Sequence, residues 1–146
     1  MKLVIQRVTK ARVSITGKVV GRIEKGLFVL FGAAKGDTPQ KALFLADKVA
    51  KLRVMADENG KMNLSVKEIK DASLLVVSQF TLYADTSAGN RPSFIQAAEP
   101  EIALNLYNLF IERLRSLGIK VETGKFGEYM KIESFLDGPV TIVMEK

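Results

Sequence analysis

The sequence predicts a mixed α/β protein, in which a curled, barrel-like sheet with many antiparallel strands is covered by two long helices. Three observations predict this class. Short apolar segments with strand periodicity recur along the chain, two longer segments have helical periodicity, and the order is strands, helix, strands, helix, strands. A chain of 146 residues has the size of one ordinary domain, so we expect residues 1–146 to form a single domain.

The first part of the chain predicts a series of short strands. Apolar residues alternate with polar ones over 3–8, 13–15 and 19–23, and basic or glycine-containing breaks separate these segments. The sequence around Gly17 is typical of a hairpin turn. Residues 27–32 are continuously apolar, which predicts a strand that is buried on both faces.

The first helix is predicted to begin after Thr38, which can cap it, with Pro39 at the first helical position. Apolar residues then recur at helical spacing as far as about Leu52. A short strand at 53–55 and a turn at Gly60 are predicted to follow.

The second half of the chain repeats this arrangement. Residues 74–80 predict another buried strand, and 86–93 predict a polar loop. The longest helix is predicted from Pro100 to a stop at Gly118. The last strands are predicted at 119–121, 130–136 and 140–144, with Asp137-Gly138-Pro139 breaking the sheet between the final two.

The composition excludes several kinds of chemistry. The chain contains no cysteine and no histidine, so disulfides, zinc thiolates, cysteine nucleophiles and Ser-His-Asp triads are impossible within it. No paired-carboxylate spacing stands out, and the glycine-containing segment 32–36 lacks the ending of a phosphate-binding loop. We therefore predict no metal site and no cofactor.

Composition also gives expectations about location and partners. The N-terminal residues lack a signal peptide, and no apolar run approaches the roughly 18 residues that span a bilayer, so we expect a cytoplasmic protein without a membrane partner. The net charge of +6 is compatible with a solvated basic surface or with attraction to a polyanion such as RNA. Charge alone leaves both open.

The segment Ser78-Gln79-Phe80-Thr81 is the first candidate site, because it places polar side chains at the end of a buried strand. In a straight strand Ser78 and Thr81 lie on opposite faces, so they converge only if the chain bends. Such a bend would also free backbone N–H groups, which an oxyanion hole requires. The alternative is a strand end whose polar groups only satisfy one another.

Gly138-Pro139 is the second candidate, because this pair presents carbonyl oxygens and few donors, which suits an ammonium group. A plain hairpin turn is the alternative. Arg91, in the polar loop, could hold a phosphate or be a solvated charge. Arg7 interrupts an apolar strand, so we expect it to pair with an acid or with a set of carbonyl groups.

Taken together, these motifs resemble the D-aminoacyl-tRNA deacylase family over the whole chain. The matching stretches are Ile5-Gln6-Arg7-Val8, Gly60-Lys61-Met62-Asn63-Leu64, Val76-Val77-Ser78-Gln79-Phe80-Thr81-Leu82, Arg91-Pro92-Ser93-Phe94 and Asp137-Gly138-Pro139-Val140-Thr141. One departure is Leu136, where the family often has asparagine.

The resemblance implies a homodimeric ester hydrolase that frees D-amino acids, and glycine mischarged on tRNA-Ala, from the 3′ end of tRNA. It implies that a cis Gly138-Pro139 peptide enters the partner's site as a chiral selector that rejects L-aminoacyl-tRNA. Arg7 would fix that loop, and Ser78, Gln79, Phe80 and Thr81 would form the catalytic pocket. Catalysis would use either Thr81 as nucleophile or the tRNA 2′-hydroxyl with backbone amides. The alternative functions are a non-catalytic basic domain that binds tRNA ends and a purely structural dimer.

Overall fold

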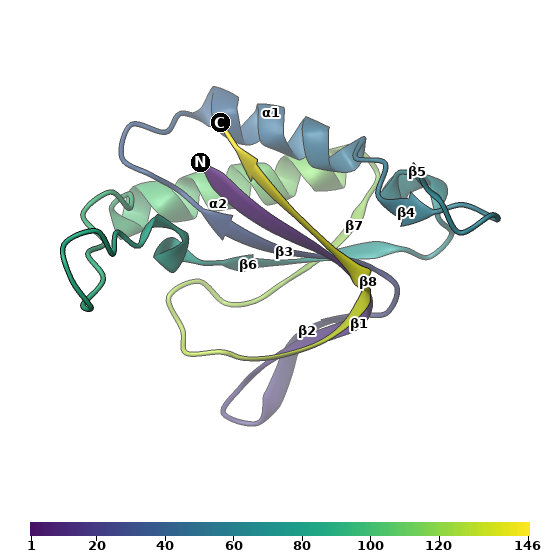
Figure 1. Cartoon of the computed structure of the whole chain (residues 1–146), viewed down its shortest axis with the longest axis horizontal. Helices are drawn as coiled ribbons and strands as arrows, with labels where there is room; N and C mark the ends of the chain where they lie inside the picture. The colour runs from purple at the N-terminus through teal and green to yellow at the C-terminus, as the bar shows by residue number, and fades with distance from the viewer.

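The computed structural model describes residues 1–146, and its elements follow the predicted order of strands, helix, strands, helix and strands (Figure 1). The helices are α1 (Pro39–Ala50) and α2 (Pro100–Ser116), with short 3-10 helices η1 (Val66–Glu68) and η2 (Phe80–Tyr83). The strands are β1 (Lys2–Ile15), β2 (Lys18–Ile23), β3 (Gly26–Gly32), β4 (Met55–Ala56), β5 (Met62–Leu64), β6 (Ser73–Ser78), β7 (Lys120–Thr123) and β8 (Lys131–Glu145).

One mixed sheet organises the molecule around the long strand β1. Its first half pairs with β3 and its second half with β2, while β8 pairs with both halves. Strands β3, β6 and β7 are parallel neighbours, and the other pairings in this sheet are antiparallel. The small antiparallel pair β4–β5 stands apart from this sheet.

The sheet curls until β2 approaches β7. A Cβ atom at Gly21 would lie 2.3 Å from the carbonyl oxygen of Thr123, so only glycine permits this contact between the two strands. The predicted mixed, curled, barrel-like sheet with two long helices is therefore confirmed. Neither helix combines the length and the apolar stretch that crossing a bilayer demands.

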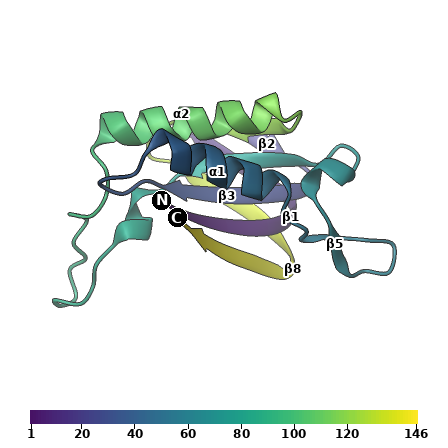
Figure 2. The ribbon, with the colours of Figure 1, turned by 90° about the horizontal axis from the view of Figure 1, so that it is seen from above.

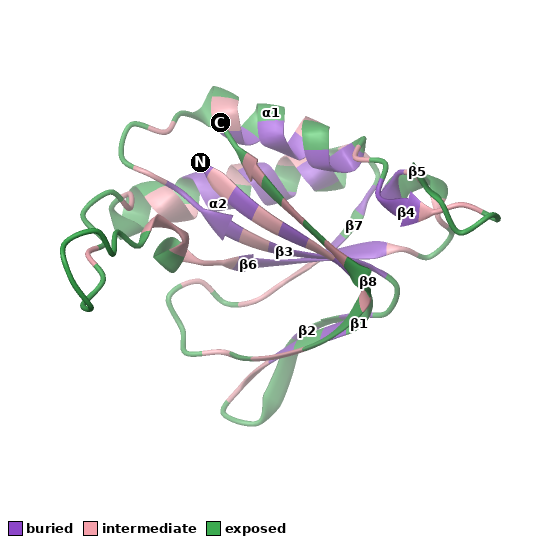
Figure 3. Ribbon diagram, viewed as in Figure 1, coloured by how far each residue is buried: buried purple, intermediate pink, exposed green.

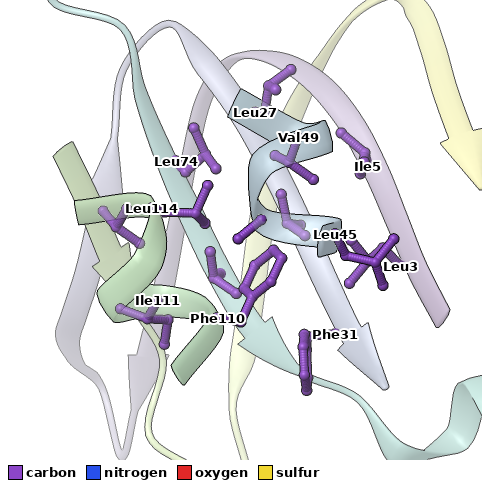
Figure 4. Packing of buried hydrophobic residues seen from close by; sticks show 14 of the residues in the cluster. Leu3, Ile5, Leu27, Phe31, Leu45, Val49, Leu74, Phe110, Ile111 and Leu114 are labelled. Atoms are coloured by element: carbon purple, nitrogen blue, oxygen red, sulfur yellow. The ribbon is translucent and has the colours of Figure 1, made fainter. Parts of the chain in front are cut away.

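The main core lies between the sheet and the two helices, which run side by side across one of its faces (Figures 2 and 4). Strand residues such as Leu3 and Phe31 meet Leu45 of α1 and Phe110 of α2 there, and all four side chains are almost completely buried. A smaller cluster around Val13 fills the inside of the curl. The outer faces of the helices and much of β8 remain exposed (Figure 3).

The prediction of separate short strands at 3–8 and 13–15 was wrong, because β1 is continuous from Lys2 to Ile15. Its basic residues do not break the strand. Lys10 and Arg12 are exposed while Ala11 and Val13 are buried, which is the ordinary alternation of a strand with one solvent-exposed face.

The ends of the first helix and the hairpins follow the prediction closely. Thr38 occupies the N-cap position of α1, but its side chain makes no capping hydrogen bond. The turn at Gly17 joins β1 to β2, and both Thr16 and Gly17 have positive φ, as a two-residue hairpin turn requires. The predicted short strand at 53–55 forms slightly later, as β4.

The predicted break at Asp137-Gly138-Pro139 was also wrong, as was the alternative of a hairpin there. Both halves of β8 pair antiparallel with β1, so the chain keeps its direction through this segment. The interruption is instead a bulge. Gln6 pairs with Thr141 and Val8 pairs with Leu136, which leaves residues 137–140 opposite Arg7 alone.

Candidate active site

Strand β6 ends at Ser78, where the chain bends into η2. The last pair between β6 and β3 joins Ser78 to Phe31, and β3 itself ends at Gly32, so Phe80 has no strand to pair with. The backbone of Gln79 turns with φ −148° and ψ 84°, and its N–H donates to the Phe31 carbonyl at 2.7 Å. The chain therefore bends here, which was the condition stated for Ser78 and Thr81 to converge, and the strand predicted to reach Phe80 stops earlier.

The bend leaves two consecutive backbone donors free. Within η2 the first hydrogen bonds are donated by later residues, such as the Leu82 N–H to the Gln79 carbonyl. The N–H groups of Phe80 and Thr81 have no acceptor in the structure, and both residues are exposed. Adjacent free amides at a fixed turn are the arrangement that stabilises a developing oxyanion.

The side chains near this turn offer no general base to Thr81. Its hydroxyl accepts a hydrogen bond from the Gln79 side-chain amide, which cannot take up a proton at neutral pH. A hydrogen bond from the Ser87 N–H lowers the pKa of Asp85, which weakens it as a base. Burial raises the pKa of Tyr83 to about 12, so this phenol also stays neutral.

A cavity of about 650 Å³ opens beside the bend. It lies between the end of β6, the segment before α2, and the segment that leads into β8. Its walls are mostly apolar, with Phe31 on β3 and Val77 on β6 among the buried residues that contribute. Of the predicted site residues, Ser78, Gln79 and Phe80 line this cavity, and Thr81 does not.

Aromatic and aliphatic side chains form the rim of the cavity. Phe80 and Phe94 make a T-shaped pair with ring centroids 5.0 Å apart. Ile95 and Tyr129 are 71% and 93% exposed, and Phe126 packs from below against the core. Sequence reasoning missed Phe126 and Tyr129. The available signal was the presence of two large rings in an otherwise polar segment before the last strand.

Two carboxylates also line the cavity. Glu128 forms an ion pair with Lys125 at 3.0 Å, and Glu99, at the start of α2, has no ion-pair partner. Neither hydrogen-bonds to Thr81. No group of three or more acidic side chains in the structure is arranged to hold a metal ion.

Arg7 holds the bulge of β8 from beneath. Its guanidinium is nearly buried, and its Nε lies 3.1 Å from Oδ2 of Asp137 and donates to the Asp137 carbonyl at 3.2 Å. Its Nη1 donates to the Val54 carbonyl at 2.8 Å. The expectation that Arg7 pairs with an acid or with carbonyl groups is confirmed for both kinds of partner.

The bulge that Arg7 supports presents Gly138 and Pro139 to solvent, and the peptide bond between them is cis. Leu136 pairs with Val8 immediately before the bulge, so this segment forms with leucine in place of the asparagine that the family often has. Arg91 is exposed in the loop between the bridged residues Asp85 and Ser93.

Within one chain the two candidate segments lie far apart. The register aligns Ser78 with Phe31 and Leu3, whereas the bulge lies opposite Arg7, four residues further along β1. From β6 to β8 there are three strand spacings, which correspond to about 14 Å across the sheet, and the offset of four residues corresponds to about 13 Å along the strands. A single chain therefore does not bring Gly138-Pro139 to the bend at Ser78.

Comparison with known proteins identifies the family of the chain. A family model described as D-Tyr-tRNA(Tyr) deacylase matches residues 4–145. The chain belongs to this deacylase family. Relatives named D-aminoacyl-tRNA deacylase include one from Limosilactobacillus reuteri, 53% identical with 100% of both chains covered, and one from Fervidobacterium nodosum, 50% identical over 99% of this chain and 97% of the relative.

Two solved structures share the fold of this chain. A c-Myc DNA Unwinding Element Binding Protein superposes with a TM-score of 0.92 at 41% identity, covering 100% of this chain and 99% of the other. A probable eukaryotic D-amino acid tRNA deacylase gives a TM-score of 0.83 at 16% identity, covering 98% and 97%, which shows a shared fold. The family resemblance inferred from the motifs is confirmed.

Proposed function

We propose that this deacylase-family member hydrolyses the ester that joins a D-amino acid to the terminal ribose of tRNA. The observation that carries the proposal is the pair of free N–H groups at Phe80 and Thr81, which open beside an apolar cavity. Paired amide donors at a bend can stabilise an oxyanion, and relatives of this chain are named as deacylases, so these two observations together favour the hydrolase over the binding domain.

The cavity has the character of a site for the terminal adenosine. Purine rings bind well to aromatic side chains, and Phe80, Phe94 and Tyr129 surround the opening. With the adenine against the Phe80–Phe94 pair, which leaves Tyr129 free, the ribose and its ester would lie at the bend. The ester carbonyl oxygen would then accept hydrogen bonds from the Phe80 and Thr81 amides as the tetrahedral intermediate forms.

The tRNA itself would supply the missing activation of water. Thr81 has no base to make its hydroxyl nucleophilic, whereas the substrate carries a 2′-hydroxyl next to the ester. Each oxyanion donor stabilises the transition state by about 3–4 kcal/mol, and positioning contributes about 7–11 kcal/mol. These terms suffice for an activated aminoacyl ester without a covalent enzyme intermediate.

Chiral selection would require a second copy of the chain. The separation between the bend and Gly138-Pro139 within one chain supports a homodimer in which each bulge enters the partner's cavity. Phe135 and Val143, both on β8 beside the bulge, are large apolar residues that are 62% and 63% exposed, as expected of a surface covered in a dimer.

In that arrangement the carbonyl groups of Gly138 and Pro139 would hold the α-ammonium group of the substrate. An L side chain would then collide with the bulge, a D side chain would point outward, and glycine would be accepted. This is rejection by steric clash, so it tolerates many different D side chains.

The direct test is deacylation of D-tyrosyl-tRNA and L-tyrosyl-tRNA by the purified protein. We expect release of D-tyrosine at a rate at least tenfold above that of L-tyrosine, because only the L side chain meets the bulge. The measurement is the loss of acid-precipitable labelled amino acid with time. Equal rates would refute the proposed chiral selection, and no release from either substrate would refute the proposed hydrolase activity.

Replacing Thr81 separates the two catalytic routes. We expect Thr81→Ala to keep at least about a third of the wild-type kcat, because the backbone N–H groups and the 2′-hydroxyl remain. Single-turnover deacylation of D-tyrosyl-tRNA measures this. A Thr81→Pro variant, which lacks the N–H, is the counterpart and should lose at least about 10²-fold. Total loss in Thr81→Ala, together with an acyl group trapped on wild-type Thr81, would instead establish covalent catalysis.

A further inference from the structure

A second hollow, of about 540 Å³, adjoins the first cavity. It lies over the hairpin of β1 and β2 and the beginning of β8. The alternation at the start of β8 explains how one strand serves both: Ile132, like Met130 just before the strand, lines the first cavity, and Lys131 and Glu133 line the second. Glu128 and Tyr129 line both, so the two hollows meet at the start of this strand.

The second hollow is polar, and its lining holds two basic residues, Arg12 and Lys131, and two acidic ones, Glu128 and Glu133. Glu128 pairs with Lys125, which lies outside the lining. Arg12 and Glu133 neutralise each other, with Arg12 Nε and Glu133 Oε2 2.7 Å apart. Lys131 lines the same hollow and has no carboxylate partner, nor has Lys10 beside it. The hydrogen bond from Arg12 lowers the pKa of Glu133, and the charges of Lys131 and Lys10 lower it further. Because both carboxylates are already paired, Lys131 and Lys10 are the unpaired charges here.

Tyr129 stands between the two hollows and is held by no other part of the chain. Its side chain is 93% exposed, and its hydroxyl forms no hydrogen bond in the structure. A flat ring at the junction of an apolar cavity and a polar groove with an unpaired lysine is the arrangement that binds single-stranded nucleic acid, through stacking on the ring and phosphate contacts in the groove.

We propose that this second hollow binds the single-stranded nucleotides that precede the terminal adenosine of the RNA substrate, with Tyr129 stacking on a base and Lys131 contacting a phosphate. The inference rests on the proposed function, since it takes the first cavity as the adenosine site. The strand would pass from the first cavity around Tyr129 to the outer face of β1 and β8.

The test is the affinity of the intact protein for ribonucleotides that end in a 3′ adenosine and grow from one to four residues, C-C-A being the three-residue member. We expect the wild-type affinity to rise about tenfold when the first nucleotides are added, and Lys131→Gln to abolish most of that rise. In a plot of log affinity against log salt concentration, the slope for this variant should be smaller in magnitude by about 0.7, which is the value for one phosphate contact to a single strand.

Matched variants separate this role from a general effect of charge. Lys67→Gln removes an exposed, unpaired lysine from η1 and should keep both the rise and the slope. Tyr129→Ala should lower affinity for the three-residue strand about tenfold, and Tyr129→Phe should restore it, since the ring is retained. Sedimentation of Tyr129→Ala should show the wild-type oligomeric state.

Three results would overturn the inference: affinity independent of strand length, equal losses in Lys131→Gln and Lys67→Gln, or a Tyr129→Ala variant that loses only oligomerisation. These outcomes are distinct from failure of the proposed function. A protein that cleaves D-tyrosyl-tRNA without length-dependent binding would refute the groove alone. One that binds longer strands without cleaving the ester would refute the hydrolase alone.

Discussion

An Arg7→Met variant is expected to be about 3 kcal/mol less stable than the wild type, and to lose its preference for D-aminoacyl substrates. Methionine can replace the apolar stem of Arg7, but the carbonyls of Val54 and Asp137 and the Asp137 carboxylate lose their donor. A buried acceptor without a partner costs about 1–3 kcal/mol, and the 35% exposure of the Asp137 side chain limits its share. Urea unfolding measures the first effect, and paired D- and L-tyrosyl-tRNA assays measure the second.

Arg12→Met provides a matched control for Arg7→Met. Both arginines belong to β1, and each pairs with one carboxylate of β8, but the Arg12–Glu133 pair is exposed. Exposed pairs contribute little because water and salt screen them, so we expect almost no change in the urea midpoint. If Arg7→Met and Arg12→Met had the same free energy of unfolding, the contacts of Arg7 with the bulge would contribute no more to stability than an exposed ion pair.

Much of the fold could be predicted because periodicity marks each element separately. The apolar runs around Val29 and Val76 became buried parallel strands, and the helical spacings became α1 and α2. Continuity was not predictable in the same way. A strand can continue through Lys10 or Pro139 only if a neighbouring strand pairs with it on both sides of that residue. β8 pairs in this way with β1 around Lys10, and β1 pairs with β8 around Pro139.

The candidate site could be predicted only in part, for a similar reason. A polar end on an apolar strand marked Ser78 and Gln79, and an arginine in an apolar strand marked Arg7. The aromatic rim depends on loops such as the one holding Tyr129, whose position is set by the end of β7 and the start of β8 rather than by any local pattern. The distance between the bend and the bulge follows from register, which no single segment encodes.

The bulge is an edge feature with a function in the proposed dimer. Edge strands are open to pairing with other chains, and bulges normally prevent this by twisting the edge away. Here the bulge of β8 also exposes Gly138 and Pro139 to solvent, and Arg7 pairs with the carbonyl and carboxylate of Asp137. One local irregularity would thus protect the edge of the sheet and supply the selector to a partner.

A Gly138→Ala variant should reduce kcat/KM for D-tyrosyl-tRNA about 10²-fold while the protein stays folded. Gly138 has φ +129°, a conformation that alanine rarely adopts. The added Cβ would lie 2.8 Å from Val140 Cγ2 and 2.9 Å from the Val140 nitrogen, so the bulge must move. Since the residue is exposed, the core can remain intact. A displacement of about 1 Å in groups that position a substrate costs about 10²-fold in rate.

Gly118→Ala distinguishes this local effect from backbone strain in general. Gly118 also has positive φ, at +82°, but an added Cβ there meets nothing within 4 Å, and the residue follows the end of α2. We expect this variant to lose stability through the same kind of strain while its kcat/KM for D-tyrosyl-tRNA stays at the wild-type value. Equal kinetic losses in the two variants would mean that strain, and not the carbonyl groups of the bulge, accounts for the effect. An unchanged D-to-L ratio in Gly138→Ala would place chiral selection elsewhere in the cavity.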